Sequence, residues 1–521
     1  MKSVSRRSVL VGSVVVAGGT VLGACTGSSS KGGGGAAGTP AGSGSSAPAP
    51  ASSPGAAGFR SGCSGVEWDL EAGPAVVRDG MTILRLSFSP VSENSASLGT
   101  RVFSTSDFSH VIGEIKLLSL VGSAVYPVIG GDAHPLSKSV SPGESVELFP
   151  VFGAVPQDAG TVEAFLPNFG VVAGIPVVGE AEAGFDVAAA LSGADPDTSK
   201  AGPYSIGSAT FVADGSSDTR KDSASTTVTV SGDVTFASDS AELSGQADAV
   251  LASAVEQIKR FPSGGGLAIT GHTDDVADDA HNQTLSEQRA RAVSDRLKQL
   301  VDLSKWTVEA TGKGEGEPRV PNDSDEHRQV NRRVEIALTP SKPAEASAPA
   351  STGAAPSSAM PKASGPVGKG PEGVDVKIDA KTVHVSMERA VRVGRFLMGA
   401  LMLDVDKEVS LPAAAFTMPG SVQDKYWPAS SLAVCSLTLL SQGRYYLEAS
   451  YSTSASDSAS DAVPLSNNFV YPLQPGAPTR LPAVWPDPGG DSIVLDVPPG
   501  ENSVAPQRLS FRLTDIPVVD S

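Results

Sequence analysis

Two tracts rich in Gly, Ser, Ala and Pro divide this chain into separate folding regions. The first covers residues 26–62 and the second covers residues 341–371. Neither tract carries enough apolar side chains to offset the conformational entropy that folding costs. We therefore predict a disordered tether before the first folded region, and a disordered linker that marks a domain boundary after residue 340.

The length and composition of the chain point to several β-rich domains. A chain of 521 residues is too long for a single core, and 56 Gly and 39 Pro with only 5% aromatic residues suit β-domains joined by flexible segments. Its 57 Asp and Glu against 39 Lys and Arg give a net charge of −18, which argues against nucleic acid as a partner. Three Cys cannot form a zinc framework of paired cysteines, and we expect neither a metal nor a cofactor.

Residues 1–25 have the pattern of an export signal. Basic residues that include Arg6 and Arg7 precede an apolar run over residues 9–21, which is too short to span a bilayer comfortably. The run ends in LGAC, which resembles the lipobox of bacterial lipoproteins. That resemblance implies that Cys25 is acylated with a diacylglycerol and holds the protein on the extracytoplasmic face of the cell membrane. SRRSVL also resembles a twin-arginine export signal, although paired Arg occurs in ordinary signals too.

Two regions consist of short apolar runs that are separated by turn residues. Residues 63–180 contain MTILRLSFSPV and ESVELFPVFG, and residues 372–521 contain SLAVCSLTLLS and GRYYLEASYS. Such runs are typical of antiparallel β-sandwiches, so we predict two β-sandwich domains on either side of a central domain. Residues 181–227 are interpreted as a connecting segment with a β-hairpin. Neither sandwich shows a catalytic or metal-ligand pattern, so both are interpreted as structural or as binding envelope proteins.

The two β-regions resemble diverged copies of one another. EIKLLSLVG parallels SLTLLSQGR, and SPGESVELFPVFGAVPQDAG parallels QPGAPTRLPAVWPDPGG. Both regions also end in Ile-Pro-Val-Val, at residues 175–178 and 516–519. Shared turn chemistry alone is the alternative explanation.

Residues 228–340 alternate strands with helices and predict an α+β domain of order β-α-β-α-β-β. The expected first strand is VTFAS, and the first helix follows a capping box of Asp239 and Glu242. GLAITGH is the next strand, and a second capping box of Thr284 and Glu287 predicts the start of the second helix. WTVEATGKG and RRVEIAL supply the last two strands.

Arg289 occupies an unusual position on the second helix. It lies four residues from both Leu285 and Val293, on the apolar stripe that should face the core. A guanidinium there requires an anionic partner, and the preceding loop offers Asp274. One fixed anion beside one planar cation can recognise a zwitterion with an ammonium and a carboxylate on one carbon. The alternative is an Asp274–Arg289 ion pair that only braces the loop.

Four segments of this region resemble the OmpA-like peptidoglycan-binding domain. They are VTFASDSAEL, ITGHTDDVADDAHNQTLSEQRARAVSDRL, TGKGEGEPRVPN and NRRVEIAL, which together cover about a fifth of the chain. The resemblance implies helices on one face of a small mixed sheet, and non-catalytic binding of the diaminopimelate in peptidoglycan stem peptides. It assigns the ligand ammonium to Asp274 and the ligand carboxylate to Arg289.

The resemblance also assigns the remaining walls of the site. Thr273 and Asn282 match polar lining residues, Leu285 matches the apolar wall, and Arg332 and Arg333 match a basic pair on the last strand. A metal site of His272, Asp274, Asp278 and His281 is the weaker interpretation, because that spacing fits no recognised site.

These patterns predict a membrane-anchored lipoprotein that binds peptidoglycan and tethers the cell envelope, and no enzyme activity. The alternatives are a wall-targeted enzyme, or an adhesin or secretion scaffold that uses the β-sandwiches. With Cys25 lipidated, Cys63 and Cys435 are the two remaining thiols in an oxidising compartment, and a disulfide between them is a candidate. The alternative for Cys435 is a buried small hydrophobic residue on the face of Leu437 and Leu439.

Overall fold

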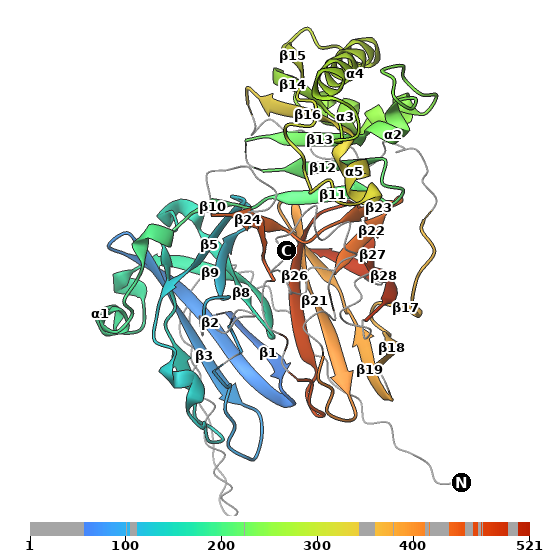
Figure 1. Cartoon of the computed structure of the whole chain (residues 1–521). Helices are drawn as coiled ribbons and strands as arrows, with labels where there is room; N and C mark the ends of the chain where they lie inside the picture. Colours follow the sequence, from blue (N-terminus) through green and yellow to red (C-terminus); the bar gives the residue numbers. More distant parts are fainter. Residues whose placement is uncertain are drawn as a thin grey trace, which may run out of the picture.

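The computed structural model describes residues 57–100, 102–104, 112–222, 224–342, 360–378, 380–411, 416, 437–453, 462–466, 470, 472–498 and 509–521. The predicted signal, Cys25 and most of the predicted tether lie outside these residues. We call residues 57–206 the N-terminal β unit, residues 207–342 the middle domain, and the described residues from 360 onward the C-terminal β unit. The two β units lie side by side, and the middle domain sits on one end of the C-terminal β unit (Figure 1).

The N-terminal β unit forms a ring of strands. Its strands are β1 (Ala57–Cys63), β2 (Val66–Arg78), β3 (Met81–Pro90), β4 (Lys116–Ser119), β5 (Ala124–Gly130), β6 (Val146–Leu148), β7 (Val151–Gly153), β8 (Thr161–Leu166), β9 (Gly170–Gly179) and β10 (Tyr204–Ser205), with helix α1 (Val187–Ser192). Pairings run from β2 through β3, β7, β5, β4, β8 and β9 and back to β2. The prediction of a two-sheet sandwich is therefore corrected for this unit, because parallel β2–β9 pairing joins the sheets.

The folded chain begins earlier than the composition predicted. Strand β1 starts at Ala57 and pairs with β2 from Ala57↔Ala72 to Cys63↔Val66. Ala57 and Phe59 pack against the core of the unit, so even this Gly-rich segment has apolar surface to bury. The predicted tether over residues 26–62 is thus too long at its C-terminal end.

The C-terminal β unit repeats much of this architecture. Its strands are β17 (Val367–Lys369), β18 (Val374–Ile378), β19 (Lys381–Ser386), β20 (Ala390–Val393), β21 (Phe396–Val405), β22 (Thr438–Ser441), β23 (Arg444–Tyr446), β24 (Ser450–Ser452), β25 (Ala462–Pro464), β26 (Thr479–Pro486), β27 (Ser492–Val497) and β28 (Phe511–Asp520). Strand β17 pairs with β28 although it lies inside the predicted linker, so the linker over residues 341–371 is also too long.

The strand pairings bear out the predicted duplication. Strands β4 and β22, which carry the KLLS and TLLS segments, pair with β8 and β27, and these pair with β9 and β28. The two Ile-Pro-Val-Val segments lie on β9 and β28, and both make parallel contacts. Val177 lies opposite Ala75, and Val518 lies opposite Ala390. Shared turn chemistry would not produce the same parallel register in both units.

The middle domain places its helices against one face of a mixed sheet. Its elements are β11 (Ser208–Val212), β12 (Ser217–Lys221), β13 (Thr226–Ser231), α2 (Gly232–Thr235), α3 (Ala247–Lys259), β14 (Gly265–His272), α4 (Asp279–Leu300), β15 (Trp306–Gly312), α5 (Asp325–Asn331) and β16 (Arg333–Pro340). The strands are ordered β11-β12-β13-β16-β14-β15, with parallel pairing only between β14 and β15. This arrangement confirms the predicted α+β class.

Three local predictions for this domain are wrong. The first strand is β13, whose Val228 and Val230 enter the core, and not VTFAS, which overlaps α2. Helix α3 starts at Ala247 without a side-chain cap, because Asp239 lies in a left-handed turn with φ of 48°. Helix α4 starts at Asp279, capped by Asp278, and so begins five residues before the predicted capping box at Thr284.

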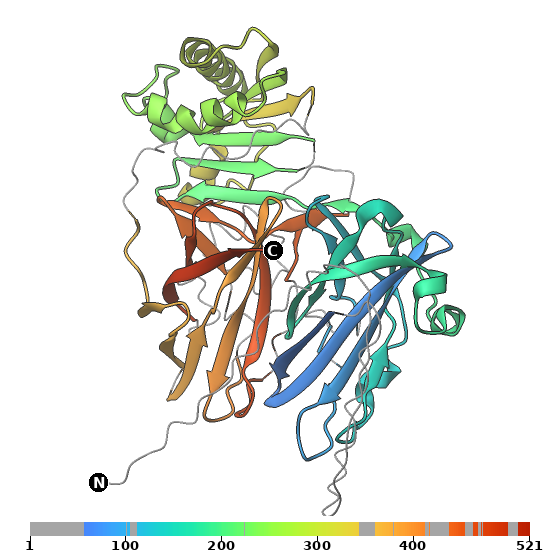
Figure 2. The same cartoon turned by 180° about the vertical axis from the view of Figure 1, so that it is seen from behind.

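The units form one connected assembly. Strand β11 pairs with β23, so the sheet of the middle domain continues into the C-terminal β unit. The two β units share an apolar cluster of Leu118, Leu120, Val125, Phe165, Ile206, Val391, Val393, Phe396, Met398, Ala449, Tyr451, Leu465 and Val484. This cluster packs the two β units directly against each other. The middle domain lies at one end of the C-terminal β unit and not between the two β units (Figure 2). Among the described residues, no helix has the length and apolar character needed to cross a membrane.

Cys63 carries a free thiol in this structure. It is 2% exposed, and burial raises its pKa to about 12. The candidate partner Cys435 lies outside the described residues, so the disulfide stays a prediction.

Candidate functional site

Helix α4 buries a cation among apolar side chains. Leu285, Val293 and Leu297 face the sheet, and Arg289 on the same stripe is only 5% exposed, as the spacing predicted. The guanidinium lies 5.1 Å from the ring centroid of Phe236, and its Nε donates a hydrogen bond of 2.9 Å to the carbonyl oxygen of Ser240. Burial lowers the pKa of Arg289, although nearby carboxylates oppose that effect.

Nε is the only nitrogen of Arg289 that donates a hydrogen bond to the described residues. Its two terminal nitrogens have no hydrogen-bond or ion-pair partner among the residues that the structure describes. A guanidinium presents five N–H donors in a planar fork, and leaving such donors unpaired in a buried place is costly. The unused side of the fork is therefore available to an incoming anion.

Asp274 has a different partner from the one that the sequence predicted. It follows β14, and its Oδ2 accepts a hydrogen bond of 2.6 Å from Nη1 of Arg332. Arg332 also binds both carboxylate oxygens of Asp233, each at 2.7 Å. These carboxylates raise the pKa of Arg332, with the Asp233 hydrogen bonds as the largest cause. The alternative of a direct Asp274–Arg289 ion pair is not present among the described residues, and Oδ2 of Asp274 pairs with Arg332.

Asn282 braces the loop that carries Asp274. Its Nδ2 donates to the carbonyl oxygens of Asp274 and Ala277, each at 3.1 Å, and to Oε2 of Glu315 at 2.6 Å. Its 2% exposure leaves little of it for a ligand. Thr273 is equally buried, its N–H donates to Gly314, and its Oγ1 has no partner in the described structure. Both residues position the loop, while Leu285 is buried on α4 at 9% exposure, and its role as the apolar wall stays a prediction.

Arg333 does not join the site. Its Nε donates to Oε1 of Glu335 at 2.7 Å, and its Nη2 donates to the carbonyl oxygen of Glu317. Arg332 is the C-cap residue of α5 and Arg333 is the first residue of β16, and their side chains bind different partners. The predicted basic pair is corrected to Arg332 alone. His272 pairs in register with Arg333, and burial lowers its pKa to about 4.

Three of the four residues of the weaker metal interpretation serve other contacts, and His272 is buried with both ring nitrogens lacking a hydrogen-bond partner in the described structure. Asp278 caps α4, His281 Nε2 lies 2.8 Å from Oδ1 of Asp239, and Asp274 binds Arg332. No group of three or more His, Cys, Asp or Glu within the described segments has a geometry suited to a metal ion.

Sequence reasoning missed Asp233, Phe236 and Ser240, which precede α3. Asp233 fixes Arg332, Phe236 supports the guanidinium of Arg289, and Ser240 accepts its Nε hydrogen bond. These residues lie about 50 to 100 positions from their partners, and helical or strand periodicity gives no signal over such separations.

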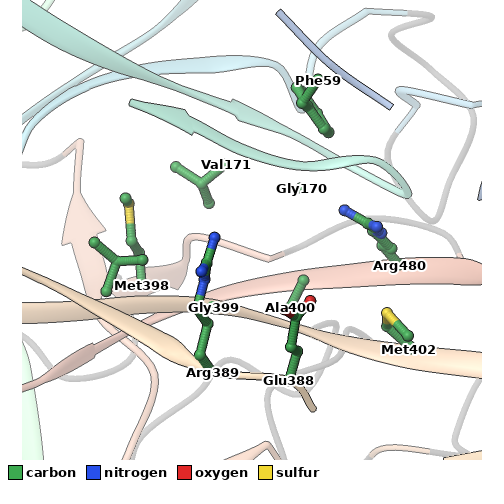
Figure 3. Close-up of a pocket in the computed structure, with 11 residues that line it drawn as sticks. Phe59, Gly170, Val171, Glu388, Arg389, Met398, Gly399, Ala400, Met402 and Arg480 are labelled. Carbon is green, nitrogen blue, oxygen red and sulfur yellow. The ribbon is translucent and has the colours of Figure 1, made fainter. Parts of the chain in front are cut away.

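A small cavity lies between the two β units, far from Arg289 in the sequence (Figure 3). Its volume is about 70 Å³, and its walls include Phe59 and Val171 from one unit and Met398 and Arg480 from the other. Such a volume holds a few water molecules. The cavity is therefore too small for a cell-wall fragment, and the surroundings of Arg289 are the better candidate site.

The middle domain thus combines a mixed sheet covered by helices with two buried charged residues, Asp274 and Arg289. Residues 235–332 match the sequence model of the OmpA family, which identifies an OmpA-family domain over these residues.

Named relatives align with the same region. Outer membrane porin F of Pseudomonas aeruginosa is 39% identical over 103 residues, which are 20% of this chain and 29% of the porin. Outer membrane protein A of Escherichia fergusonii is 34% identical over 119 residues, which are 21% of this chain and 48% of that protein. The solved cell wall anchor of the T6SS from Pseudomonas aeruginosa is 30% identical, with 24% of this chain and 88% of that chain covered and a TM-score of 0.22. The chain thus spans less than half the length of the two curated relatives.

Proposed function

We propose that the middle domain binds peptidoglycan non-covalently through the free amino-acid end of diaminopimelate. Arg289 holds the ligand carboxylate and Asp274 holds the ligand ammonium. The observation that carries this proposal is the pair of unpartnered terminal nitrogens on Arg289, a cation that is only 5% exposed.

The chemistry of the site suits a zwitterion. A carboxylate can accept two parallel hydrogen bonds from the guanidinium fork, which a lysine ammonium cannot offer. Asp274 gives one oxygen to Arg332, while its Oδ1 accepts only a long contact of 3.4 Å from the Val276 N–H. Oδ1 is therefore the oxygen that meets an ammonium. Arg332 fixes this carboxylate in place before the ligand arrives.

The OmpA-family domain over residues 235–332 supports the same function. The cell wall anchor that is 30% identical over most of its length points in the same direction. Residues that position the loop, such as Asn282, complete a binding site without a nucleophile or a metal in the described residues. We infer that the domain binds and does not catalyse.

We infer also that the protein is a lipoprotein anchored through Cys25 on the extracytoplasmic face of the membrane. The lipobox-like LGAC supports this anchor. Residues 26–56 then connect the lipid to β1 and span roughly 100 Å when fully extended. In this arrangement the chain tethers the membrane to the cell wall.

Binding to purified sacculi tests the wall site. Arg289→Ala and Asp274→Ala should each weaken binding about ten- to a hundredfold, because each removes charge-assisted hydrogen bonds. Arg289→Lys should weaken binding as well. Arg291→Ala is the matched control: it lies on the same helix with 67% of its side chain exposed, paired with Glu287.

The result is decisive when the variants remain folded by circular dichroism. Wild-type binding by folded Arg289→Ala and Asp274→Ala variants would refute the proposed site. Release of soluble fragments from the sacculi by the wild-type protein would instead support the wall-targeted enzyme. If the protein binds sacculi through the β units and does not need Asp274 or Arg289, the result would support the scaffold alternative.

A further inference from the structure

Four basic side chains converge where the middle domain meets the C-terminal β unit. We call Lys221, Arg260, Arg395 and Arg444 the junction cluster. Arg260, Arg395 and Arg444 all act electrostatically on Lys221, so the four cations are neighbours. Such a gathering is notable in a chain whose net charge is −18.

The strand register aims two of these residues at helix α3. Lys221 pairs with Ser208, and Arg444 pairs with Val212, so both lie on one face of the sheet. The Nη2 of Arg444 donates to Oγ of Ser253 on α3 at 2.8 Å, which identifies that face as the one under the helix. Arg260 directly follows α3, at its C-cap.

Arg395 approaches from the turn between β20 and β21. Its Nη2 donates to the carbonyl oxygen of Ile206 at 3.2 Å, two residues before the start of β11. It is exposed, whereas Lys221, Arg260 and Arg444 are half-buried. The cluster is therefore open to solvent on the side of Arg395.

The cluster lacks partners for its charges. Lys221 and Arg260 have no hydrogen bond or ion pair within the described residues, and Nε of Arg260 is buried without a partner. Two neighbouring polar atoms are also buried without a hydrogen-bond partner in the described structure. They are Oγ1 of Thr219, on the strand of Lys221, and Oε1 of Gln257, three residues before Arg260; both side chains are more than nine-tenths buried. Buried donors are almost always hydrogen-bonded, so Nε of Arg260 and the hydroxyl group of Thr219 point to an absent acceptor.

The surrounding carboxylates do not balance the cations. Glu256 acts on Lys221 and Arg260, and Asp222 acts on Arg395. Asp222 already accepts hydrogen bonds from Ala224 and Ser225. With Lys221 protonated, four cations against two carboxylates leave an excess of two positive charges. Burial and the three arginines lower the pKa of Lys221 to about 7, as expected where cations are crowded together.

We propose that the junction cluster binds a phosphate dianion, either free phosphate or the phosphomonoester of a lipid head group. Two negative charges match the excess, and tetrahedral oxygens accept hydrogen bonds from several guanidinium and ammonium groups at once. Bound phosphate joins α3 and β12 to the C-terminal β unit, and so fixes the wall-binding domain relative to the β units. This site shares no residue with the proposed diaminopimelate site, so either can fail alone.

Isothermal titration of the full-length protein with inorganic phosphate tests the site. We expect saturable binding that chloride at matched ionic strength does not reproduce. Lys221→Met and Arg260→Met should each weaken it about tenfold or more, because each removes a charge-assisted hydrogen bond. Lys259→Met is the matched control, since Lys259 is exposed and adjacent to Arg260. Equal binding by the wild-type protein and both cluster variants, or no saturable phosphate binding, would overturn the free-phosphate source.

Two further measurements complete the test. Binding of the dianion at pH 8 should draw a proton onto Lys221, so the heat should vary with the ionisation enthalpy of the buffer, and Lys221→Met should abolish that variation. Vesicles containing phosphatidic acid are compared with neutral vesicles, using protein that lacks its lipid. Selective binding that Arg260→Met removes would assign the head-group source. Failure with both phosphate and phosphatidic acid would overturn the proposal.

Discussion

Nη1 of Arg332 lies 2.6 Å from Oδ2 of Asp274, so the carboxylate assigned to the ligand ammonium is already held by a neighbouring cation. Arg332 comes from the junction of α5 and β16, 58 residues beyond Asp274. The sequence offered Asp274 as the anionic partner of Arg289, whereas in the structure Asp274 pairs with Arg332. Arg332 fixes the anion, and the terminal nitrogens of Arg289 have no partner among the described residues.

The first prediction concerns this ion pair. Arg332→Gln leaves Asp274, with 12% of its side chain exposed, without its charged partner, and should lower the free energy of unfolding by about 1–3 kcal/mol. Urea denaturation of the full chain measures the effect. Arg328→Gln is the control, because Arg328 binds the more exposed Asp275 and Asp325 and should cost less than about 1 kcal/mol. Equal effects of the two substitutions would contradict a special role for Arg332.

The second prediction concerns the loop before α4. Asn282→Ala removes the donor to Asp274, Ala277 and Glu315, and should speed hydrogen exchange over residues 273–278. Binding to sacculi should weaken with it, because Asp274 loses its fixed position. Thr284→Ala, which loses a bond only to Ala280 of the same helix, should leave the loop unchanged. Unchanged exchange in the Asn282→Ala variant would show that the loop is held by other contacts.

The third prediction concerns pH and a buried carboxyl between the β units. Burial raises the pKa of Glu448 to about 8, although Ser466 and Lys116 oppose the rise. In the unfolded chain the group ionises near its ordinary value of 4.5. Between these values the folded state binds more protons, so stability should fall as pH rises from about 4.5 to about 8.

Glu448→Gln should therefore reduce the loss of folding stability as pH rises. We expect the variant to gain roughly 1–3 kcal/mol over the wild-type protein at alkaline pH, with little difference near pH 4. Thermal unfolding across this pH range measures it, and exposed Glu182→Gln serves as the control. Glu163, whose pKa burial raises to about 7, should retain part of the pH dependence. Parallel pH profiles for the wild-type and Glu448→Gln proteins would contradict the assignment.

The fourth prediction concerns the anchor. Cys25→Ser should abolish acylation and move the protein from the detergent phase to the aqueous phase, since two acyl chains are needed for stable anchoring. Detergent partitioning with mass spectrometry of the N-terminal peptide measures this. Cys63→Ala should keep the wild-type distribution, because Cys63 is a buried thiol of β1. Wild-type protein in the aqueous phase would exclude the lipid anchor.

The amino-acid sequence by itself determined the features that depend on local pattern. The stripe of Leu285, Val293 and Leu297 placed Arg289 on the buried side of a helix, and the structure agrees because 3.6-residue periodicity is a property of the helix alone. The repeated Ile-Pro-Val-Val segments likewise predicted two related β units, since equal strand registers require similar side-chain patterns.

Only the tertiary structure decided which distant groups meet. Asp233 and Asp274 share Arg332, Arg333 turns away to Glu335, and Tyr445 of the C-terminal β unit pairs with Phe211 of the middle domain. The closure of the N-terminal β unit also depends on one parallel pairing, β2 with β9, across about 100 residues. Contacts of this kind are set by packing and charge compensation between elements, and periodicity within any one element carries no information about them.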